Sequence, residues 1–124
     1  MTQTVLRVDM EYSSGAPHEA RRAVRQWLEH LVVDAVRVDD LVLVVSELIT
    51  NAVVHARSPA QLIATADDGR VRVEVHDHDP SPPRPRTTPK DVGGFGLPIV
   101  ELLTDGWGWT TTPSGKYVWT ETLL

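Results

Sequence analysis

The sequence predicts an α+β fold, a two-layer α/β sandwich with helices on one face of a mixed, mainly antiparallel sheet. Strand-like and helix-like segments follow one another in the order β-α-α-β-β-α-β-β. An Asp-Gly step joins two of the β-rich segments, which is a strong hairpin signal. The 124 residues are enough for one domain with a core and too few for two, so we expect a single domain over 1–124.

The first half of the chain supplies one strand and two helices. Residues 5–10 alternate between two faces, as a strand does. A helix over about 17–33 begins with a proline, whose missing N–H costs nothing in a first turn. A second helix covers 41–57, a stretch without Gly or Pro. Asp39 and Asp40 precede it, where a helix N-terminus favours negative charge.

The second half supplies the hairpin, a loop, a third helix and two more strands. Residues 61–66 and 71–77 form the hairpin. Residues 80–89 hold five prolines, which neither a strand nor a helix accommodates, so they form a loop. A third helix and two last strands follow; their predicted ranges are 97–103, 107–109 and 117–123, with a turn over 113–116.

Composition excludes several classes of function. A formal charge of −5 and a pI near 5.4 argue against sequence-independent nucleic-acid binding, which requires a basic face. The lack of cysteine excludes disulfides, thiolate zinc sites and cysteine nucleophiles. We find neither a signal peptide nor an apolar run of the ~20 residues that span a bilayer. A soluble cytoplasmic protein is expected.

The second helix carries the first candidate site residues. Glu47, Asn51 and His55 follow at four-residue steps within a strongly apolar run. At roughly 100° per residue, Glu47 and Asn51 fall just outside the apolar stripe and His55 falls on its edge. A carboxylate and an amide therefore line the edge of the core, where a ligand groove can form. His55 is more simply a packed, hydrogen-bonded histidine.

Two further features follow along the chain, and each has a plain alternative. Asp77 ends a predicted strand, where Asp is also a common turn residue. The Gly93–Gly96 run opens the third helix; it is either a simple connection or a backbone that approaches a phosphate. The spacing of a P-loop is absent.

Together these features resemble the ATP-binding (Bergerat) domain shared by gyrase, a class of heat-shock chaperones, histidine kinases and MutL. The most similar branch is that of the anti-sigma-factor serine/threonine kinases. The resemblance extends from about Pro17 to the end of the chain. Its motifs are E-L-x-x-N-A-x-x-H-A from Glu47, the aspartate Asp77, G-x-G-L from Gly94, and the ending G-K-x-V-W from Gly115.

The resemblance implies a cofactor and a set of residue roles. Asn51 would coordinate Mg²⁺ between the phosphates of ATP, and Glu47 would act as general base toward the attacking hydroxyl. Asp77 would accept a hydrogen bond from the adenine amino group. The phosphates would be held by Gly94, Gly96 and Leu97.

The resemblance also implies an activity and partners. The kinase would transfer the γ-phosphoryl of ATP to a serine of an anti-sigma-factor antagonist and would sequester a sigma factor. The alternative is a nucleotide-dependent binding module without turnover. Arg21 and Arg22 are candidate partner contacts, although a solvated helix face also explains them. A homodimer is expected, and neither nucleic acid nor membrane is an expected partner.

Several residues depart from the family pattern. Asp79 and Ser81 stand where the second motif usually has glycine, and Phe95 stands where a basic or small residue is frequent. Tyr117 occupies a position that is often Thr, where it would use its own hydroxyl or obstruct the base. Residues 80–92 correspond to the family's lid over the ATP, and here the lid is short and stiffened by prolines. It carries three candidate phosphate contacts, which could equally be solvated surface cations: Arg84, Arg86 and Lys90.

Two other patterns have competing interpretations. His76 and His78 share a strand face, as in some zinc sites, but no third histidine follows nearby. Trp107 and Trp109 also share a face without basic neighbours, which favours the core or a partner patch over base stacking.

Overall fold

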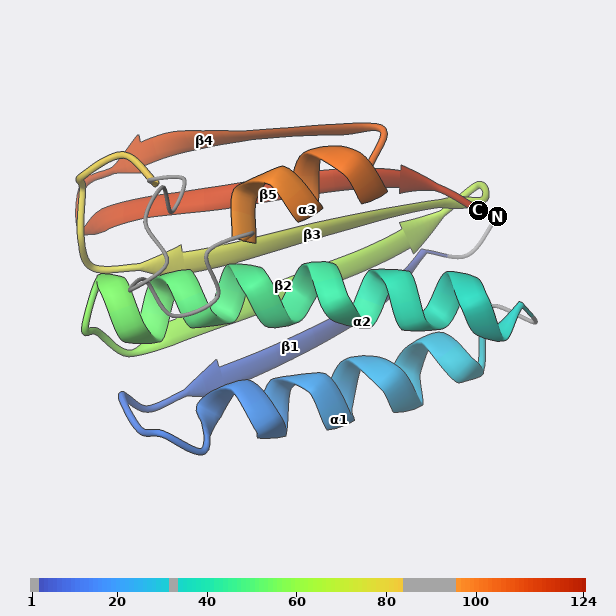
Figure 1. The fold of residues 1–124 in the computed structure, drawn as a ribbon, viewed down its shortest axis with the longest axis horizontal. Coiled ribbons are helices and arrows are strands. Elements are labelled where there is room, and N and C mark those ends of the chain that lie inside the picture. Colours follow the sequence, from blue (N-terminus) through green and yellow to red (C-terminus); the bar gives the residue numbers. More distant parts are fainter. Residues whose placement is uncertain (1–2, 32–33, 84–95) are drawn as a thin grey trace.

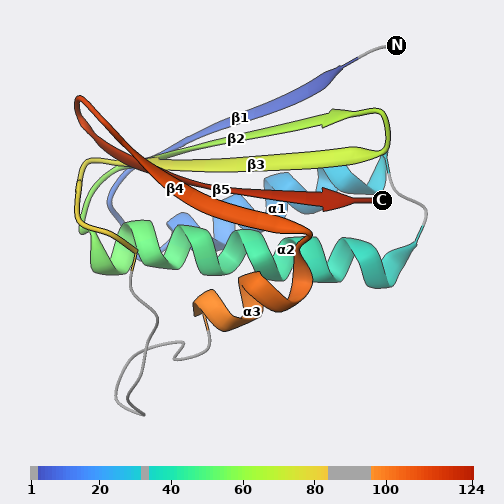
Figure 2. The same ribbon diagram turned by 90° about the horizontal axis from the view of Figure 1, so that it is seen from above.

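The computed structural model describes residues 3–31, 34–83 and 96–124. Five strands form one sheet in the order β1-β2-β3-β5-β4, and each neighbouring pair is antiparallel. The helices α1, α2 and α3 all lie on one face of this sheet (Figures 1 and 2). The predicted α+β fold is therefore confirmed. The elements are β1 (Thr4–Met10), α1 (Ala16–Glu29), α2 (Ala35–Thr50), the π-helix η1 (Asn51–His55), β2 (Ala60–Asp67), β3 (Arg70–Asp77), α3 (Gly96–Leu103), β4 (Gly106–Thr112) and β5 (Gly115–Leu123).

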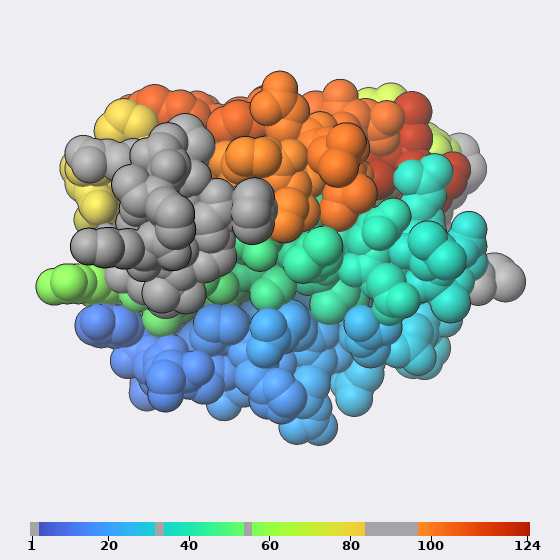
Figure 3. Space-filling view, viewed as in Figure 1, coloured from blue at the N-terminus to red at the C-terminus, as the bar shows by residue number. Residues whose placement is uncertain are grey.

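The core lies between the sheet and the helices. Alternate residues of β2 and β3 point inward, so that Leu62, Val73 and Val75 are almost completely buried. Leu48 and Ile49 of α2 meet them and are equally buried. Figure 3 shows the three helices as adjacent bands over this layer, with α2 between α1 and α3. The α2 helix thus has the core on one side and neighbouring helices on both flanks.

The second helix starts earlier than its charge pattern predicts. Asp34 caps it: the Asp34 side chain accepts hydrogen bonds from the backbone N–H of Val36 at 2.9 Å and of Arg37 at 3.4 Å. These are N–H groups that have no partner inside the helix, which is why Asp is favoured at an N-cap. Asp39 lies beyond the first turn and instead pairs with Arg25 of α1 at 2.9 Å.

The apolar periodicity predicts an α-helix over the whole of 41–57, and the structure differs from this prediction. The α-helix ends at Thr50, and a π-helix continues over Asn51–His55. The backbone N–H of Ala56 donates to Asn51 O at 3.2 Å, which is the wider i→i+5 bond. Arg57 then has a φ of 51° and ends the helix. Periodicity alone does not distinguish this single wide turn from an α-turn.

The hairpins agree with the sequence, although the last two strands are longer than predicted. Between β2 and β3, Asp68 and Gly69 have φ values of 53° and 73°. Two consecutive positive values are those of a type I′ turn, which Asp-Gly favours. β4 and β5 pair up to Thr112 and Gly115, leaving a shorter turn than the predicted 113–116. Gly115 and Lys116 therefore belong to a strand.

The sheet face opposite the helices carries a charged network. Arg72 Nε donates to Glu74 at 3.0 Å and its Nη1 donates to Glu121 at 3.1 Å, while His76 Nε2 lies 2.9 Å from Glu74. The Arg72 guanidinium also lies 4.9 Å from the ring centroid of Trp119. Burial raises the pKa of the Glu74 carboxyl, but the hydrogen bonds from His76 and Arg72 outweigh it, so that this pKa lies below its ordinary value.

This network predicts a loss of stability in acid. A carboxyl with a lowered folded-state pKa stabilises the fold above its unfolded-state pKa, which is 4.5 for Glu. That stabilisation disappears as the pH falls through the lower folded-state value. We expect urea denaturation at pH 7 and at about pH 3 to show a smaller pH-dependent loss in Glu74→Gln than in the wild type. The exposed Glu29→Gln variant is the control and should retain the wild-type loss; equal losses in all three proteins would contradict the prediction.

Across the described ranges, no helix combines the length and the apolar character that crossing a bilayer requires.

Candidate nucleotide-binding site

Glu47 and Asn51 lie together at the end of α2. Both side chains are half-buried, and they are one helical turn apart, so they project from the same side of the helix. Asn51 is the residue at which the α-helix changes to the π-helix η1. Single π-turns inside helices are frequent at functional sites. The π-turn also packs against β3, the strand that ends in Asp77.

The first two predicted motifs therefore meet at one end of the molecule. In Figure 1, the η1 end of α2 lies beside the C-terminal end of β3. Helix α3 begins at Gly96 on the same side of the sheet, and Leu97 is buried, 5% exposed. Gly94, Phe95, Arg84, Arg86 and Lys90 lie outside the described residues, as does the side chain of His55.

Asp77 has a partner that the sequence does not reveal. It lies opposite Lys116 in the β3–β5 register. Lys116 Nζ donates to Asp77 Oδ1 at 3.2 Å and lies 3.0 Å from Oδ2. Both residues are buried, Asp77 with 4% and Lys116 with 6% of its surface exposed. A buried charged pair thus stands at the position where the resemblance places the base-binding aspartate.

The turn after Asp77 is built from carboxylates in place of the family's glycines. The backbone N–H of Asp79 donates to Asp77 Oδ1 at 2.8 Å, and that of Ser81 donates to Asp79 Oδ1 at 2.9 Å. Each bond joins a side chain to the backbone two residues on, as in an Asx-turn. Lys116 Nζ also donates to Asp79 O at 3.0 Å. The Asp-x-Asp-x-Ser run therefore holds its conformation without glycine.

Tyr117 lies on the other side of the sheet from this pair. Successive residues of a strand point to opposite faces, and Tyr117 pairs with His76 on the open face. The two rings stack with centroids 4.8 Å apart. The Tyr117 side chain therefore faces away from Asp77, whereas the neighbouring Lys116 contacts it. The alternation of β5, in which Lys116 shares a face with the buried Val118, carries the signal for this assignment.

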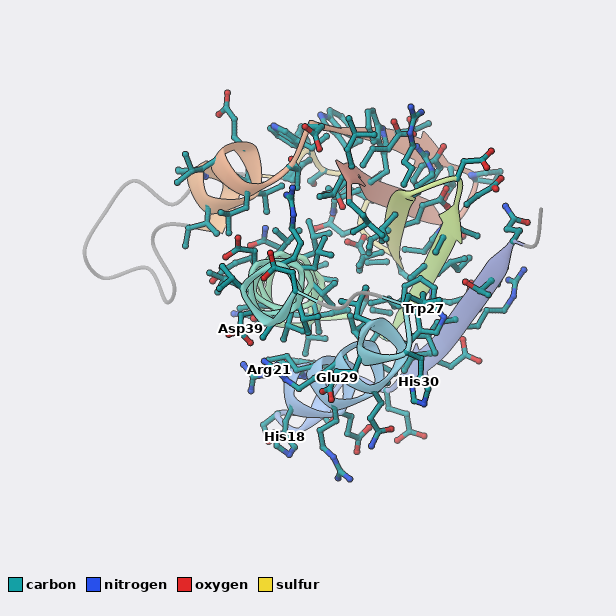
Figure 4. The ribbon with its side chains drawn as sticks, turned by 90° about the vertical axis from the view of Figure 1, so that its right-hand side faces the viewer. His18, Arg21, Trp27, Glu29, His30 and Asp39 are labelled. Carbon is teal, nitrogen blue, oxygen red and sulfur yellow. The ribbon has the colours of Figure 1, made fainter. Side chains whose placement is uncertain are left out.

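Arg21 connects the first helix to the site. Its Nη1 donates to Ser46 Oγ at 3.1 Å, and Ser46 directly precedes Glu47. Figure 4 shows Arg21 on the side of α1 that adjoins α2. Arg22 is exposed. Both predicted partner contacts are thus exposed to solvent, and Arg21 is in addition engaged within the protein.

An open pocket of about 600 Å³ also reaches this end of the sheet. Its lining comes from the ends of β1, β2 and β3 and from the β4–β5 turn, and includes Asp9, Gln61, His76, Asp77 and His78. Glu47 and Asn51 are not among the lining residues. In the described part of the chain, no group of three metal-binding side chains forms, and His76 is engaged by Glu74 and Tyr117. The zinc interpretation of His76 and His78 therefore gains no support.

The residues present suit a magnesium nucleotide. Asn51 offers an amide oxygen of the kind that Mg²⁺ accepts, and the ion needs only one or two protein ligands beside phosphate and water. Asp77 is a buried acceptor held in place by its turn and by Lys116. Glu47 supplies a carboxylate one helical turn from Asn51.

Comparisons with known proteins identify a family and two similar folds. The model of the family described as "Histidine kinase-like ATPase domain" matches residues 14–121. The RsbU and RsbW domains of Rv1364c from Mycobacterium tuberculosis superpose with a TM-score of 0.78 at 22% identity, over 98% of this chain and 32% of that one. The SiaB–SiaC complex from Pseudomonas aeruginosa gives a TM-score of 0.71 at 12% identity, over 96% and 88%.

At these identities the two structures establish the fold, and this chain spans about a third of the first of them. No curated protein matches the sequence. The family match covers all of the candidate site residues named above, from Arg21 to Tyr117. This chain belongs to the histidine kinase-like ATPase domain family.

Proposed function

We propose that this protein is an ATP-dependent kinase of the anti-sigma-factor type, which phosphorylates a serine of an antagonist protein and sequesters a sigma factor. The observation that carries the proposal is the placement of Glu47 and Asn51 on one side of α2, next to the strand that ends in Asp77. An acid one turn from an amide suits phosphoryl transfer, which needs a positioned base and a metal ligand. A protein that only binds nucleotide has no need of the acid.

Each residue has a role in this proposal. Asn51 would hold Mg²⁺, which when bound neutralises charge that develops on the transferred phosphoryl group. Glu47 would orient the serine hydroxyl and accept its proton. Asp77 would bind the purine base, and the start of α3 would face the phosphates with its free N–H groups.

The comparisons support a protein partner as well. One solved relative is a complex of two proteins, SiaB and SiaC, and the other joins RsbU and RsbW domains in one chain. A surface around Arg22 on α1 is the proposed contact for the antagonist or sigma factor. Arg22 is exposed, and Arg21 beside it reaches the residue before Glu47.

Mg-ATP binding is the first test. Calorimetry on the full chain should show saturable binding that Asn51→Ala weakens strongly when Mg²⁺ is present and weakens little when Mg²⁺ is absent, because only the metal contact is lost. The control is Gln26→Ala on α1, which changes an exposed side chain and should bind Mg-ATP as the wild type does. An exposed residue such as Asp105 would be a poor control, because its carboxylate accepts a hydrogen bond from the backbone of Leu123. No binding of Mg-ATP by the wild type would refute the proposal.

A binding module without turnover is the second candidate. It is favoured by Asp79, which places a carboxylate where the family has a glycine and adds negative charge close to the nucleotide. A pull-down with and without ATP, followed by phosphoserine mapping of the captured protein, separates the two candidates. ATP-dependent capture with no phosphoserine would favour the binding module.

A further inference from the structure

Asp77 and Lys116 form a buried pair of a carboxylate and an ammonium group, and this pair affects which nucleotide base the site can bind. Lys116 stands on β5 directly opposite Asp77, and it shares the buried face of the strand with Val118. The two side chains are 3% and 7% exposed. The ammonium contacts both carboxylate oxygens of Asp77 and the carbonyl oxygen of Asp79. A cation is thus fixed within 3.2 Å of the proposed base-binding carboxylate.

Stability alone is a weak reason for such a pair. The strand neighbours of both residues on this face are the buried Val75 and Val118, so that apolar side chains would fit the pattern. Removing two charges from water is costly, and an apolar pair of similar volume is often as stable or more so. The pair is therefore better explained by a property that two apolar residues would lack.

That property is the possession of a hydrogen-bond donor and an acceptor side by side. A carboxylate has about four acceptor positions. Among the described residues, Asp79 N–H and Lys116 engage Oδ1, and Lys116 alone engages Oδ2. Oδ2 therefore keeps room for one more donor. The ammonium carries three N–H donors. One N–H is shared between the two carboxylate oxygens of Asp77 and one points to Asp79 O, which leaves the third for a ligand.

Adenine and guanine differ at the atom that meets this pair. Adenine carries an amino group, a donor, at the ring position where guanine carries a carbonyl oxygen, an acceptor. A lone carboxylate accepts from the amino group and repels the carbonyl oxygen. A carboxylate with an ammonium beside it meets either group, because Asp77 accepts from adenine and Lys116 donates to guanine.

We infer that Lys116 makes this site a general purine site, one that binds GTP as well as ATP. The inference rests on the proposed function, since it assumes that the nucleotide base lies at Asp77. It departs from the adenine preference that an aspartate alone would give. Lys116 acts here as a specificity-determining residue, and neither Glu47 nor Asn51 needs to change its role.

The test begins with the wild-type protein. Calorimetry with Mg-ATP and with Mg-GTP should give dissociation constants within about tenfold of each other, a difference of at most about 1.4 kcal/mol. A site in which guanine meets only an acceptor would discriminate far more, because mismatched buried polar groups cost about 10⁴-fold or more. Binding of ATP with GTP more than about 100-fold weaker would overturn the inference and leave the proposed function standing. Binding of neither nucleotide would refute both.

Variants of Lys116 then test whether its ammonium group is responsible for the binding of GTP. Lys116→Met should weaken GTP at least about tenfold more than ATP, because guanine then faces an uncompensated carboxylate. Lys116→Arg keeps a donor cation and should retain GTP binding. The exposed Arg70→Met, at the far end of β3, should change neither nucleotide.

Folding is monitored for each variant by thermal denaturation, since breaking a buried pair is itself destabilising. If Lys116→Met does not fold, the double variant Lys116→Met with Asp77→Asn replaces it, as it removes both charges. The neutral amide presents a donor and an acceptor and should bind both purines, so a strong preference for adenine in that variant would contradict the inference. Equal weakening of ATP and GTP in Lys116→Met would assign Lys116 a purely structural role and would also overturn it.

Discussion

Glu47→Gln should abolish most phosphotransfer while leaving nucleotide binding intact. The amide has nearly the same size and can still form hydrogen bonds, but it cannot accept the proton of the attacking hydroxyl. General-base catalysis is typically worth about 10²–10⁴-fold in rate, so we expect a loss in that range. The measurement is the transfer of labelled phosphate from ATP to the captured antagonist, with ATP affinity measured in parallel by calorimetry.

The matched control for this variant is Glu29→Gln. Glu29 is an exposed glutamate at the end of α1, and the change removes the same charge from a residue outside the candidate site (Figure 4). It should transfer phosphate at the wild-type rate. Unchanged transfer by Glu47→Gln would exclude Glu47 as the base. A parallel loss of ATP affinity would instead indicate that Glu47 holds the nucleotide or its metal.

Gly115→Ala should destabilise the fold severely. A Cβ at this position would lie 2.0 Å from Asp77 O and 2.6 Å from His78 Cα, both backbone atoms that no rotamer change can remove. The start of β5 must therefore move away from the end of β3. We expect a loss of about 3 kcal/mol or more, above the usual cost of overpacking because backbone has to shift. Urea denaturation at pH 7 would measure it.

Gly15→Ala is the corresponding control, because a Cβ there meets no atom within 4 Å. It precedes α1 with a φ of −83°, which alanine adopts freely. A small effect in Gly15→Ala together with a large one in Gly115→Ala would identify close backbone approach as the cause. A Gly115→Ala protein as stable as the wild type would contradict it.

The sequence predicted the layers and most of the element order, because those depend on local patterns. Alternation gave β3, the Asp-Gly step gave the turn before it, and apolar residues at helical spacing gave α1 and α2. The sequence patterns were wrong about the bounds and the type of a helix where a single hydrogen bond decides them. Asp34 rather than Asp39 marks the start of α2, and the π-turn at Asn51 interrupts a stretch whose apolar periodicity is unbroken.

The sequence predicted individual residues of the candidate site, but it did not predict which of their side chains contact one another. Glu47, Asn51 and Asp77 were predicted from residue type and spacing, and all three lie within the residues that the family model matches. The contact of Asp77 with Lys116 joins residues 39 positions apart and depends on the β3–β5 register. No local pattern contains that register. The same holds for Arg21 and Ser46, which are brought together only by the packing of α1 on α2.

The order of pairing along the sheet has a consequence for folding kinetics. β2 with β3, and β4 with β5, are hairpins whose turns close over a few residues, and such local pairs form in microseconds. Joining the two hairpins through β3 and β5 closes a much longer loop, and so does the pairing of Thr4 with Ala66 at the β1 edge. Long closures are slow. We therefore expect the hairpins to form early and the junction that holds Asp77 and Lys116 to form late, so that a stalled intermediate would contain most of the strands and no nucleotide site.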